Sequence, residues 1–408
     1  MMYQKKPVRL LVMICIASVI SMLSFALWPV FLLNLGDQWG LSNTQIGWIG
    51  GGYFVGYVIA TPLLVGGTDR IDARIIYIFG CLSSALGCLG FALFADGFWS
   101  AFIAWAFVGA GLAGTYMPGL QIVNARLSPE FRVRAVPFYT SCFGFGSGGS
   151  FLAMGFFLTQ STHVMAAFVG AAAAVISGVM IFLFVEPVAP AVQDGGKKRH
   201  PLDLRPAFRK PLARGYIAAY GAHTFELFAY RNWSFALFIF VGAQASPALT
   251  PTLVSVIVSL LTVTGMLSSI FGAKLCLSYG RHRVITLIGA AGALMAVASA
   301  YTLDGPVWLA IGILWLFNIV IMLDSGALTA GTVEASDAHD RGALLAVHTL
   351  VGFGGGALGG PVVGYMLDLG GGANSMDAWF GAVMVMGLGS VVVAIIQWRF
   401  WRAGPTVK

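Results

Sequence analysis

The chain has 408 residues, of which 58 % are hydrophobic and 10 % are charged, and its formal net charge is +7. A soluble domain carries about 25 % charged residues, so this composition excludes a soluble globular protein. The mean hydropathy of +0.85 over the whole chain predicts an outer surface that faces lipid.

Hydrophobic runs of about 18 to 28 residues recur along the chain, and each is long enough to cross a hydrocarbon core of about 30 Å. They predict an all-α membrane protein with twelve transmembrane helices. In chain order the predicted spans are Val8–Leu35, Thr44–Val65, Ile75–Ala95, Phe98–Val123, Ala135–Leu158, His163–Val185, Gly215–Gly242, Thr250–Gly272, Val284–Leu303, Val307–Val333, Gly342–Leu367 and Ala378–Trp401.

The basic residues predict the orientation of these spans. If the N-terminus is cytoplasmic, the terminal tails and the even-numbered loops hold every Lys and Arg except Arg231, and the opposite loops hold none. This is the positive-inside pattern. We therefore expect a multi-pass protein of the bacterial inner membrane, with both termini in the cytoplasm. The basic surplus reflects insertion into the lipid bilayer, so it does not predict a nucleic-acid partner.

The chain also repeats itself at a separation of 208 residues. Gly144-Phe-Gly-Ser-Gly-Gly matches Gly352-Phe-Gly-Gly-Gly, and Leu41-Ser-Asn-Thr matches Leu249-Thr-Pro-Thr. Parallel repeats of this kind are typical of transporter folds built from two similar halves. The longest polar stretch separates the halves. We predict an N-terminal six-helix bundle at 1–187, a cytoplasmic linker at 188–212 and a C-terminal six-helix bundle at 213–408.

Two loops at the same separation carry a family resemblance. The loop after the second span reads Val65-Gly-Gly-Thr-Asp-Arg-Ile-Asp-Ala-Arg, and the loop after the eighth reads Ala273-Lys-Leu-Cys-Leu-Ser-Tyr-Gly-Arg-His-Arg. Both resemble the G-x-L-A-D-R-x-G-R-R loops of major facilitator superfamily transporters. The first loop departs from that pattern at Val65 and Asp72, where glycines are usual, and the second lacks the Asp-Arg pair. The resemblance covers the whole chain and implies the major facilitator fold, with two pseudo-symmetric six-helix bundles.

The same resemblance implies a set of gating residues. In the family, the Asp-Arg pair of these loops forms a latch between helices on the cytoplasmic side, and such a charge-assisted bond holds that side closed. Carried over to this chain, the gating residues are Asp69, Arg70, Arg74 and Arg281.

Three charged residues lie at membrane depth, where a charge costs about 2.5–3.5 kcal/mol and needs a partner or a function. Glu226 lies about 18 Å and Arg231 about 25 Å from the inner end of the seventh span, and Asp324 lies in the tenth. His223, Glu226 and Tyr230 share one helical face. Arg231 lies about 140° from Glu226 on an ideal helix, so a direct pair between them requires a helix break or another helix.

Two roles are open for these residues. They form either a buried ion pair that fastens the seventh span to the tenth, or a transport site. In the transport site Arg231 binds an anionic group of the substrate, because its planar guanidinium matches an oxyanion. Glu226 or Asp324 then takes up the coupling proton, a role that suits a buried carboxyl. His223 is either a proton relay or a hydrogen-bonded structural residue. Further candidate substrate contacts are Tyr230, Trp233, Tyr116 and Asn318.

The C-terminal half narrows the resemblance. His223-Thr-Phe-Glu-Leu, Asp324-Ser-Gly-x-Leu-Thr-Ala-Gly and His348-x-x-x-Gly-Phe-Gly-Gly-Gly together resemble the nitrate/nitrite and cyanate porter-like branch. Nitrate porters pair two intramembrane arginines, whereas this chain has Arg231 alone, so nitrate itself does not follow. The resemblance and the charges favour a monomeric secondary active transporter that moves a small anionic organic solute by alternating access, coupled to protons.

Other functions stay open. A divalent-cation carrier could use His223, Glu226 and Asp324 as ligands, but the positive charge of Arg231 opposes cation binding. A drug exporter of the same fold would usually carry an arginine in helix 4 and a proline in the glycine-rich stretch of helix 5, and both are absent from those places in this chain. A non-transporting membrane sensor would be expected to carry an added soluble domain. No catalytic triad, phosphate-binding loop or metal motif appears in the sequence, so we expect neither an enzyme nor a bound metal or cofactor.

Overall fold

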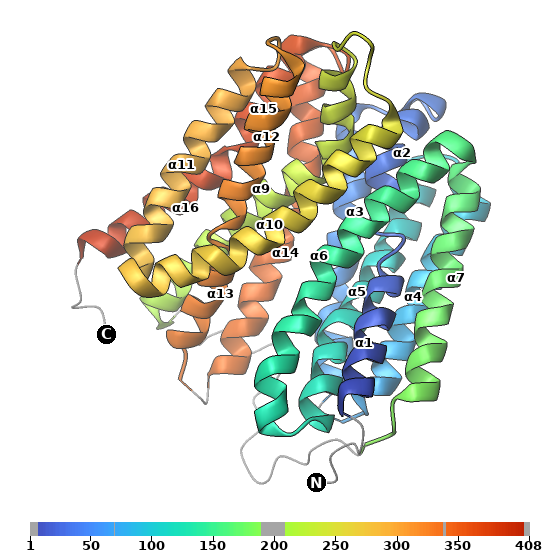
Figure 1. The fold of residues 1–408 in the computed structure, drawn as a ribbon, viewed down its shortest axis with the longest axis vertical. Helices are drawn as coiled ribbons and strands as arrows, with labels where there is room; N and C mark the ends of the chain where they lie inside the picture. The colour runs from blue at the N-terminus through green and yellow to red at the C-terminus, as the bar shows by residue number, and fades with distance from the viewer. Residues whose placement is uncertain (1–6, 69, 189–208, 338–339, 404–408) are drawn as a thin grey trace. The chain divides into compact units, whose positions relative to one another are not determined.

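The computed structural model describes residues 7–68, 70–188, 209–337 and 340–403. All regular secondary structure in these residues is α-helical (Figure 1). The helices before residue 189 are α1 (Pro7–Ser21), α2 (Leu27–Gln38), α3 (Asn43–Gly67), α4 (Ala73–Phe94), α5 (Phe98–Arg126), α6 (Pro129–Gln160) and α7 (His163–Phe184). The helices after residue 208 are α9 (Pro211–Gly242), α10 (Pro251–Tyr279), α11 (Arg281–Tyr301), α12 (Val307–Met322), α13 (Ser325–Glu334), α14 (Arg341–Leu369), α15 (Met376–Met386) and α16 (Leu388–Arg402).

In the described residues, ten helical segments are long and apolar enough, by length and composition, to cross a membrane. In that set α12 with α13, and α15 with α16, each count as one segment. The other two predicted spans correspond to α1 with α2, and to α9. α9 has 32 residues, which is long enough, but it is less apolar because it carries the charged and polar residues expected to form the site.

Side-chain caps determine where several helices begin. Ser128, Thr162 and Thr250 each accept a hydrogen bond from the backbone N–H three residues later, which satisfies a donor that the helix itself leaves free. Proline follows Ser128 and Thr250 at the first helical position, where its missing N–H has no cost. The fifth span therefore begins at Pro129, one to two turns before the predicted Ala135, because the helix continues past its apolar stretch.

Three predicted spans are broken in the structure. The first is interrupted at residues 22–26, the tenth at Leu323–Asp324 and the twelfth at Gly387. At the first break, Ser150 of α6 accepts a hydrogen bond from the Ala26 N–H at 2.8 Å and donates one to the Leu23 carbonyl at 2.6 Å. This hydroxyl replaces intrahelical partners, which is how serine makes a break tolerable inside a membrane.

Proximity of Cα atoms divides the chain into two units. One contains Met1–Phe31 and Gly52–Pro201, and the other contains Leu32–Gly51 and Leu202–Lys408. The first nine residues of α3 therefore belong with the second unit. The predicted linker, 188–212, lies mostly outside the described residues, so the predicted boundaries of the two bundles stay predictions.

Glycines allow the helices of the first unit to approach closely. A Cβ on Gly109 of α5 would lie 1.7 Å from the Tyr53 carbonyl oxygen of α3, and one on Gly80 of α4 would lie 2.7 Å from the Gly114 carbonyl carbon of α5. Neither position accepts a larger residue without moving a backbone. Small residues at such crossings are the usual means by which membrane helices pack.

The second unit is organised around α9, which is buried over most of its length. It packs against α14 through glycines, since a Cβ on Gly355 would lie 2.2 Å from the Gly221 carbonyl oxygen and one on Gly359 would lie 2.5 Å from the Phe225 carbonyl oxygen. α10, α12, α13 and α16 also contact α9. A helix surrounded in this way can hold polar side chains away from lipid.

The first turn of α3 is fastened to the end of α14 within the second unit. Asp368 accepts hydrogen bonds from the N–H groups of Asn43 and Thr44 at 2.8 Å each, from Asn43 Nδ2 at 2.9 Å and from Thr44 Oγ1 at 2.6 Å. Ser42 and Gln45 form a reciprocal capping box at the same turn. A carboxylate at a helix N-terminus also interacts favourably with the helix dipole.

Candidate functional site

Glu226 lies at the centre of the second unit, with 1 % of its surface exposed. Ser390 of α16 is its hydrogen-bond donor, with Oγ 2.9 Å from Oε1 and 2.7 Å from Oε2. The hydroxyl has one proton, so the two carboxylate oxygens share it. Gly389 makes room for this contact, because a Cβ there would lie 2.6 Å from the Glu226 Cβ. Among the residues that the structure describes, the acid therefore has a neutral partner on another helix and no basic one.

His223 and Asp324 form the second polar pair. His223 Nδ1 lies 2.8 Å from Asp324 Oδ1, and both residues are buried. Asp324 stands at the break between α12 and α13, which Figure 1 draws as two consecutive orange helices. The break places the carboxylate between a helix C-terminus and a helix N-terminus, an arrangement known from ion sites in broken transporter helices. The pair joins α9 to the tenth span.

A row of aromatic rings extends from this pair toward α14. The ring of Tyr220 stacks on His223, with centroids 5.9 Å apart, and on His348 of α14, with centroids 3.8 Å apart. His348 has hydroxyl partners at both nitrogens, with Nδ1 3.0 Å from Thr332 Oγ1 and Nε2 3.3 Å from Thr329 Oγ1. By contrast, His223 Nε2 is buried and meets no hydrogen-bond partner among the described residues.

Arg231 is a second buried charged residue of α9 for which the described residues supply no counter-ion. Only 7 % of its surface is exposed, and its guanidinium carbon lies 5.9 Å from the centre of the Phe228 ring. Within residues 7–68, 70–188, 209–337 and 340–403, neither an ion pair nor a side-chain hydrogen bond joins Arg231 to another residue. Glu226 and Asp324, its two expected partners, are instead engaged with Ser390 and His223.

Three of the four expected substrate contacts use their polar groups to join helices. Tyr230 Oη donates to the Leu314 carbonyl at 2.8 Å, Trp233 Nε1 to the Gly360 carbonyl at 2.9 Å, and Asn318 Nδ2 to the Leu261 carbonyl at 2.9 Å. These bonds favour a packing role, and contact with a substrate stays a prediction.

Tyr116, the fourth expected contact, belongs to the first unit. Its ring stacks on Tyr139, with centroids 6.1 Å apart, and its backbone carbonyl accepts from the Tyr139 hydroxyl at 2.8 Å. Within the described residues, no group of three or more His, Cys, Asp and Glu side chains is arranged to hold a metal ion.

The expected gating residues belong to the chain segments that join α3 to α4 and α10 to α11, or to the first turns of α4 and α11. Asp69 lies outside the described residues, and Arg70 is exposed. Arg74 donates to the Phe182 carbonyl, and its guanidinium carbon lies 5.0 Å from the centre of the Phe182 ring. Arg281 forms a two-pronged ion pair with Glu334, with Nη2 2.7 Å from Oε1. Their gating role stays a prediction.

The first unit contains an ion pair that was not expected from the sequence. Arg126 Nη2 donates to both carboxylate oxygens of Asp72, at 2.7 and 2.8 Å, and Arg126 Nε donates to the Glu186 carbonyl at 2.9 Å. Burial acts to raise the pKa of Asp72, but hydrogen bonds from Arg126 and from the backbone N–H groups of Val188 and Arg74 outweigh it, so the pKa is lowered.

This pair has a counterpart with reversed charges in the second unit. Arg126 and Glu334 are separated by 208 residues, the separation of the internal repeat. Their partners lie at helix starts, Asp72 at the start of α4 and Arg281 at the start of α11. In both units, therefore, the end of one helix is joined to the start of another by an ion pair. The repeat separation was the signal that could have found the Asp72–Arg126 pair.

The helical spans are those of a multi-pass membrane protein. The Major Facilitator Superfamily profile matches residues 13–359, and the chain belongs to this family of secondary transporters. The predicted fold class is thereby confirmed: the chain is an all-helical membrane protein with the major facilitator fold. Membership also implies a transported small molecule and places the chain among transporters rather than enzymes. No curated protein matches the chain in sequence.

Solved structures of several transporters share the fold. An inward-facing, unoccupied bacterial homolog of the human lysosomal transporter Spinster is 14 % identical, covers 99 % of each chain and has a TM-score of 0.80. The nucleoside transporter NupG is 16 % identical, with 96 % of this chain and 99 % of that chain covered and a TM-score of 0.78. A POT family transporter in complex with 5-aminolevulinic acid is 12 % identical, with 98 % and 96 % covered and a TM-score of 0.72.

Proposed function

We propose that this transporter moves a small anionic organic solute and that Arg231 binds its anionic group. The observation that carries the proposal is the isolation of Arg231, which is 7 % exposed and has no acidic partner among the described residues. A buried charge without a counter-ion is costly. A carboxylate or similar oxyanion would compensate it through two parallel hydrogen bonds, for which the guanidinium is shaped.

We propose further that proton uptake accompanies anion uptake. An anion beside Arg231 neutralises the one positive charge that lies near Glu226 on α9, about five residues or 7.5 Å of helix rise away. An ionised Glu226 would then be an uncompensated charge, since Ser390 is a neutral partner. Protonation of Glu226 restores neutrality, and it couples the anion to a proton in the same direction.

The His223–Asp324 pair is the second proposed proton carrier. The buried Nε2 of His223, which lacks a partner among the described residues, is available to exchange a proton while Nδ1 faces Asp324. The break at Asp324 gives the pair freedom to separate, because discontinuous helices are where transporters change conformation around a bound ion.

The branch of the family, the bounds of the two bundles, the location and the gating residues are part of the same proposal. We assign the chain to the nitrate/nitrite and cyanate porter-like branch, with six-helix bundles at 1–187 and 213–408 joined by a linker at 188–212. We place it in the bacterial inner membrane as a monomer with both termini cytoplasmic. Asp69, Arg70, Arg74 and Arg281 are the proposed gating residues.

A ligand screen tests the anion site first. Purified full-length protein in detergent is heated with mono- and dicarboxylates, nitrate, nitrite, cyanate, and Mn²⁺, Ni²⁺ or Zn²⁺, and its melting temperature is recorded. At a concentration 100-fold above Kd, a ligand stabilises the folded state by about 2.7 kcal/mol. We expect a carboxylate to raise the melting temperature of wild type and of Arg399→Gln, an exposed control, but not of Arg231→Gln. Stabilisation by a divalent cation instead, unaffected by Arg231→Gln, would favour a cation carrier.

Uptake into proteoliposomes tests the coupling. With the stabilising anion as substrate, an inward proton gradient should drive uptake by wild type. Glu226→Gln should exchange substrate across the membrane but fail to accumulate it, because the variant cannot release a proton. If Arg231→Gln, Glu226→Gln and Asp324→Asn all transport like wild type, the proposed site is wrong.

A further inference from the structure

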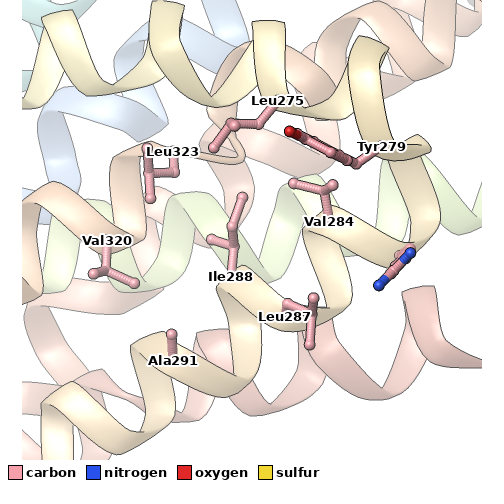
Figure 2. A pocket seen from close by; sticks show the side chains of 9 residues that line it. Leu275, Tyr279, Val284, Leu287, Ile288, Ala291, Val320 and Leu323 are labelled. Carbon is pink, nitrogen blue, oxygen red and sulfur yellow. The ribbon is translucent and has the colours of Figure 1, made fainter.

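A groove lies on the side of the second unit, between the end of α10, the start of α11 and the end of α12. Its volume is about 340 Å³, and apolar side chains form most of its wall, among them Leu287, Ala291, Val320 and Leu323 (Figure 2). This volume is within the range of about 300–1,000 Å³ that is typical of ligand pockets. The groove is therefore large enough for a stretch of hydrocarbon chain.

The groove opens onto the surface that faces lipid. Leu287 of α11 is 53 % exposed and Tyr279 of α10 is 65 % exposed, and both helices belong to membrane-length apolar segments. In such segments exposed apolar side chains lie against acyl chains. The medium that meets this groove is thus the bilayer itself.

One end of the groove is polar. Arg283 lines it together with Tyr279, at the point where α10 ends and α11 begins. Two residues earlier, Arg281 is neutralised by its ion pair with Glu334, whereas Arg283 is exposed and forms no ion pair with a residue that the structure describes. An apolar slot with an unpaired guanidinium and a phenol at its mouth is complementary to a lipid with an anionic headgroup.

We propose that this groove is a specific site for an anionic phospholipid, with one acyl chain against α11 and α12 and the headgroup phosphate at Arg283. The internal repeat supports a site specific to this half, because Ile71 and Ile75 stand 208 residues before Tyr279 and Arg283. The bound chain contacts Leu323, which with Asp324 forms the break between α12 and α13. A bound lipid therefore packs against the tenth span at its break. This inference rests on the groove and is independent of the substrate proposed above.

The test is a lipid titration followed by native mass spectrometry. Full-length, delipidated protein is titrated with phosphatidylglycerol or, as the zwitterionic comparison, phosphatidylcholine of the same acyl chains. We expect wild type to retain phosphatidylglycerol preferentially. Arg283→Gln should weaken that binding about fivefold, the factor expected for one basic residue near an anionic lipid surface. Ala291→Phe, which fills the groove, should weaken both lipids.

Two matched variants separate a site from general lipid contact. Lys274→Gln removes an exposed charge from α10 outside the groove, and Ala290→Phe adds the same bulk at the neighbouring exposed position. Both should bind phosphatidylglycerol like wild type. Because Arg283 is exposed, its replacement leaves the fold intact, and a change in lipid affinity then reports only the loss of the headgroup contact. Equal affinity of wild type and Arg283→Gln, or equal losses in Lys274→Gln and Arg283→Gln, would mean that only bulk lipid fills the groove.

Discussion

Asp72→Asn should destabilise the first unit far more than the matched change in the second. Asn still accepts the N-terminal hydrogen bond of α4, but Arg126, 2 % exposed, loses its counter-ion. Breaking a buried pair by removing one partner costs about 3–5 kcal/mol. The lower value applies, because Arg126 keeps its bond to the Glu186 carbonyl. At about 2–4 °C per kcal/mol, the melting temperature should fall by about 6–12 °C.

The reversed pair of the second unit provides the control. Glu334 is 63 % exposed in its contact with Arg281, and exposed pairs contribute about 0–1 kcal/mol. Glu334→Gln should therefore lower the melting temperature by at most about 4 °C. A thiol-reactive dye reports unfolding, since Cys81, Cys88 and Cys142 are among the buried free cysteines.

The pH dependence supplies a second measurement. The pKa of Asp72 is lowered in the folded protein, so its contribution to stability is complete above the unfolded pKa of about 3.9 and is lost as the pH falls through the folded pKa. The difference in melting temperature between wild type and Asp72→Asn should be constant from about pH 8 to 5 and should disappear below about pH 4. If Asp72→Asn and Glu334→Gln destabilise equally, or if Asp72→Asn/Arg126→Leu is no more stable than Asp72→Asn, burial of the pair does not determine its strength.

Three further changes test the packing of the helices, each read as yield of folded protein and melting temperature. Gly109→Ala should prevent folding, because its Cβ would lie 1.7 Å from a carbonyl oxygen, whereas Gly149→Ala, with nothing within 4 Å, should be tolerated. Ser150→Ala should cost about 1–3 kcal/mol, because the groups at the break of the first span lose their partner, and an unchanged melting temperature would mean that the break needs no hydroxyl. Asp368→Asn should cost about 1 kcal/mol by removing the charged cap of α3, with Asp377→Asn as the control.

Hydropathy predicted the spans well, because this pattern is local in the sequence and acts directly on membrane insertion. The breaks were not predictable in the same way. The stretch Val8–Leu35 is mostly apolar beyond Arg9, and the hydroxyl that supports its interruption belongs to Ser150, far along the chain. A hydropathy pattern contains no information about such a partner.

The charged residues show the same limit. The seventh span was correctly recognised as the carrier of buried charge, because a charge in an apolar run is visible locally. The partners were not visible. Glu226 meets Ser390, 164 residues away, and Asp72, noted only as a departure from a motif, meets Arg126. Pairing of distant residues follows from tertiary packing, which the internal repeat alone could have indicated.

The pair of His223 and Asp324 leaves one question that a double-mutant experiment answers: whether the pair fastens α9 to the tenth span or carries the coupling proton. His223→Gln and Asp324→Asn alone should each lower the melting temperature, because each leaves a buried group without its partner. The double variant His223→Gln/Asp324→Asn should recover most of that loss in melting temperature, since the two neutral side-chain amides can donate and accept hydrogen bonds to each other.

Transport measurements on the double variant then separate the two roles of the pair. If the pair only fastens helices, proton-driven accumulation returns with stability. We expect stability and substrate exchange to return without proton-driven accumulation, because the side-chain amides of Gln and Asn do not bind and release protons near neutral pH. Recovery of accumulation in the double variant would remove His223 and Asp324 from the coupling mechanism and leave Glu226 as the sole proton carrier.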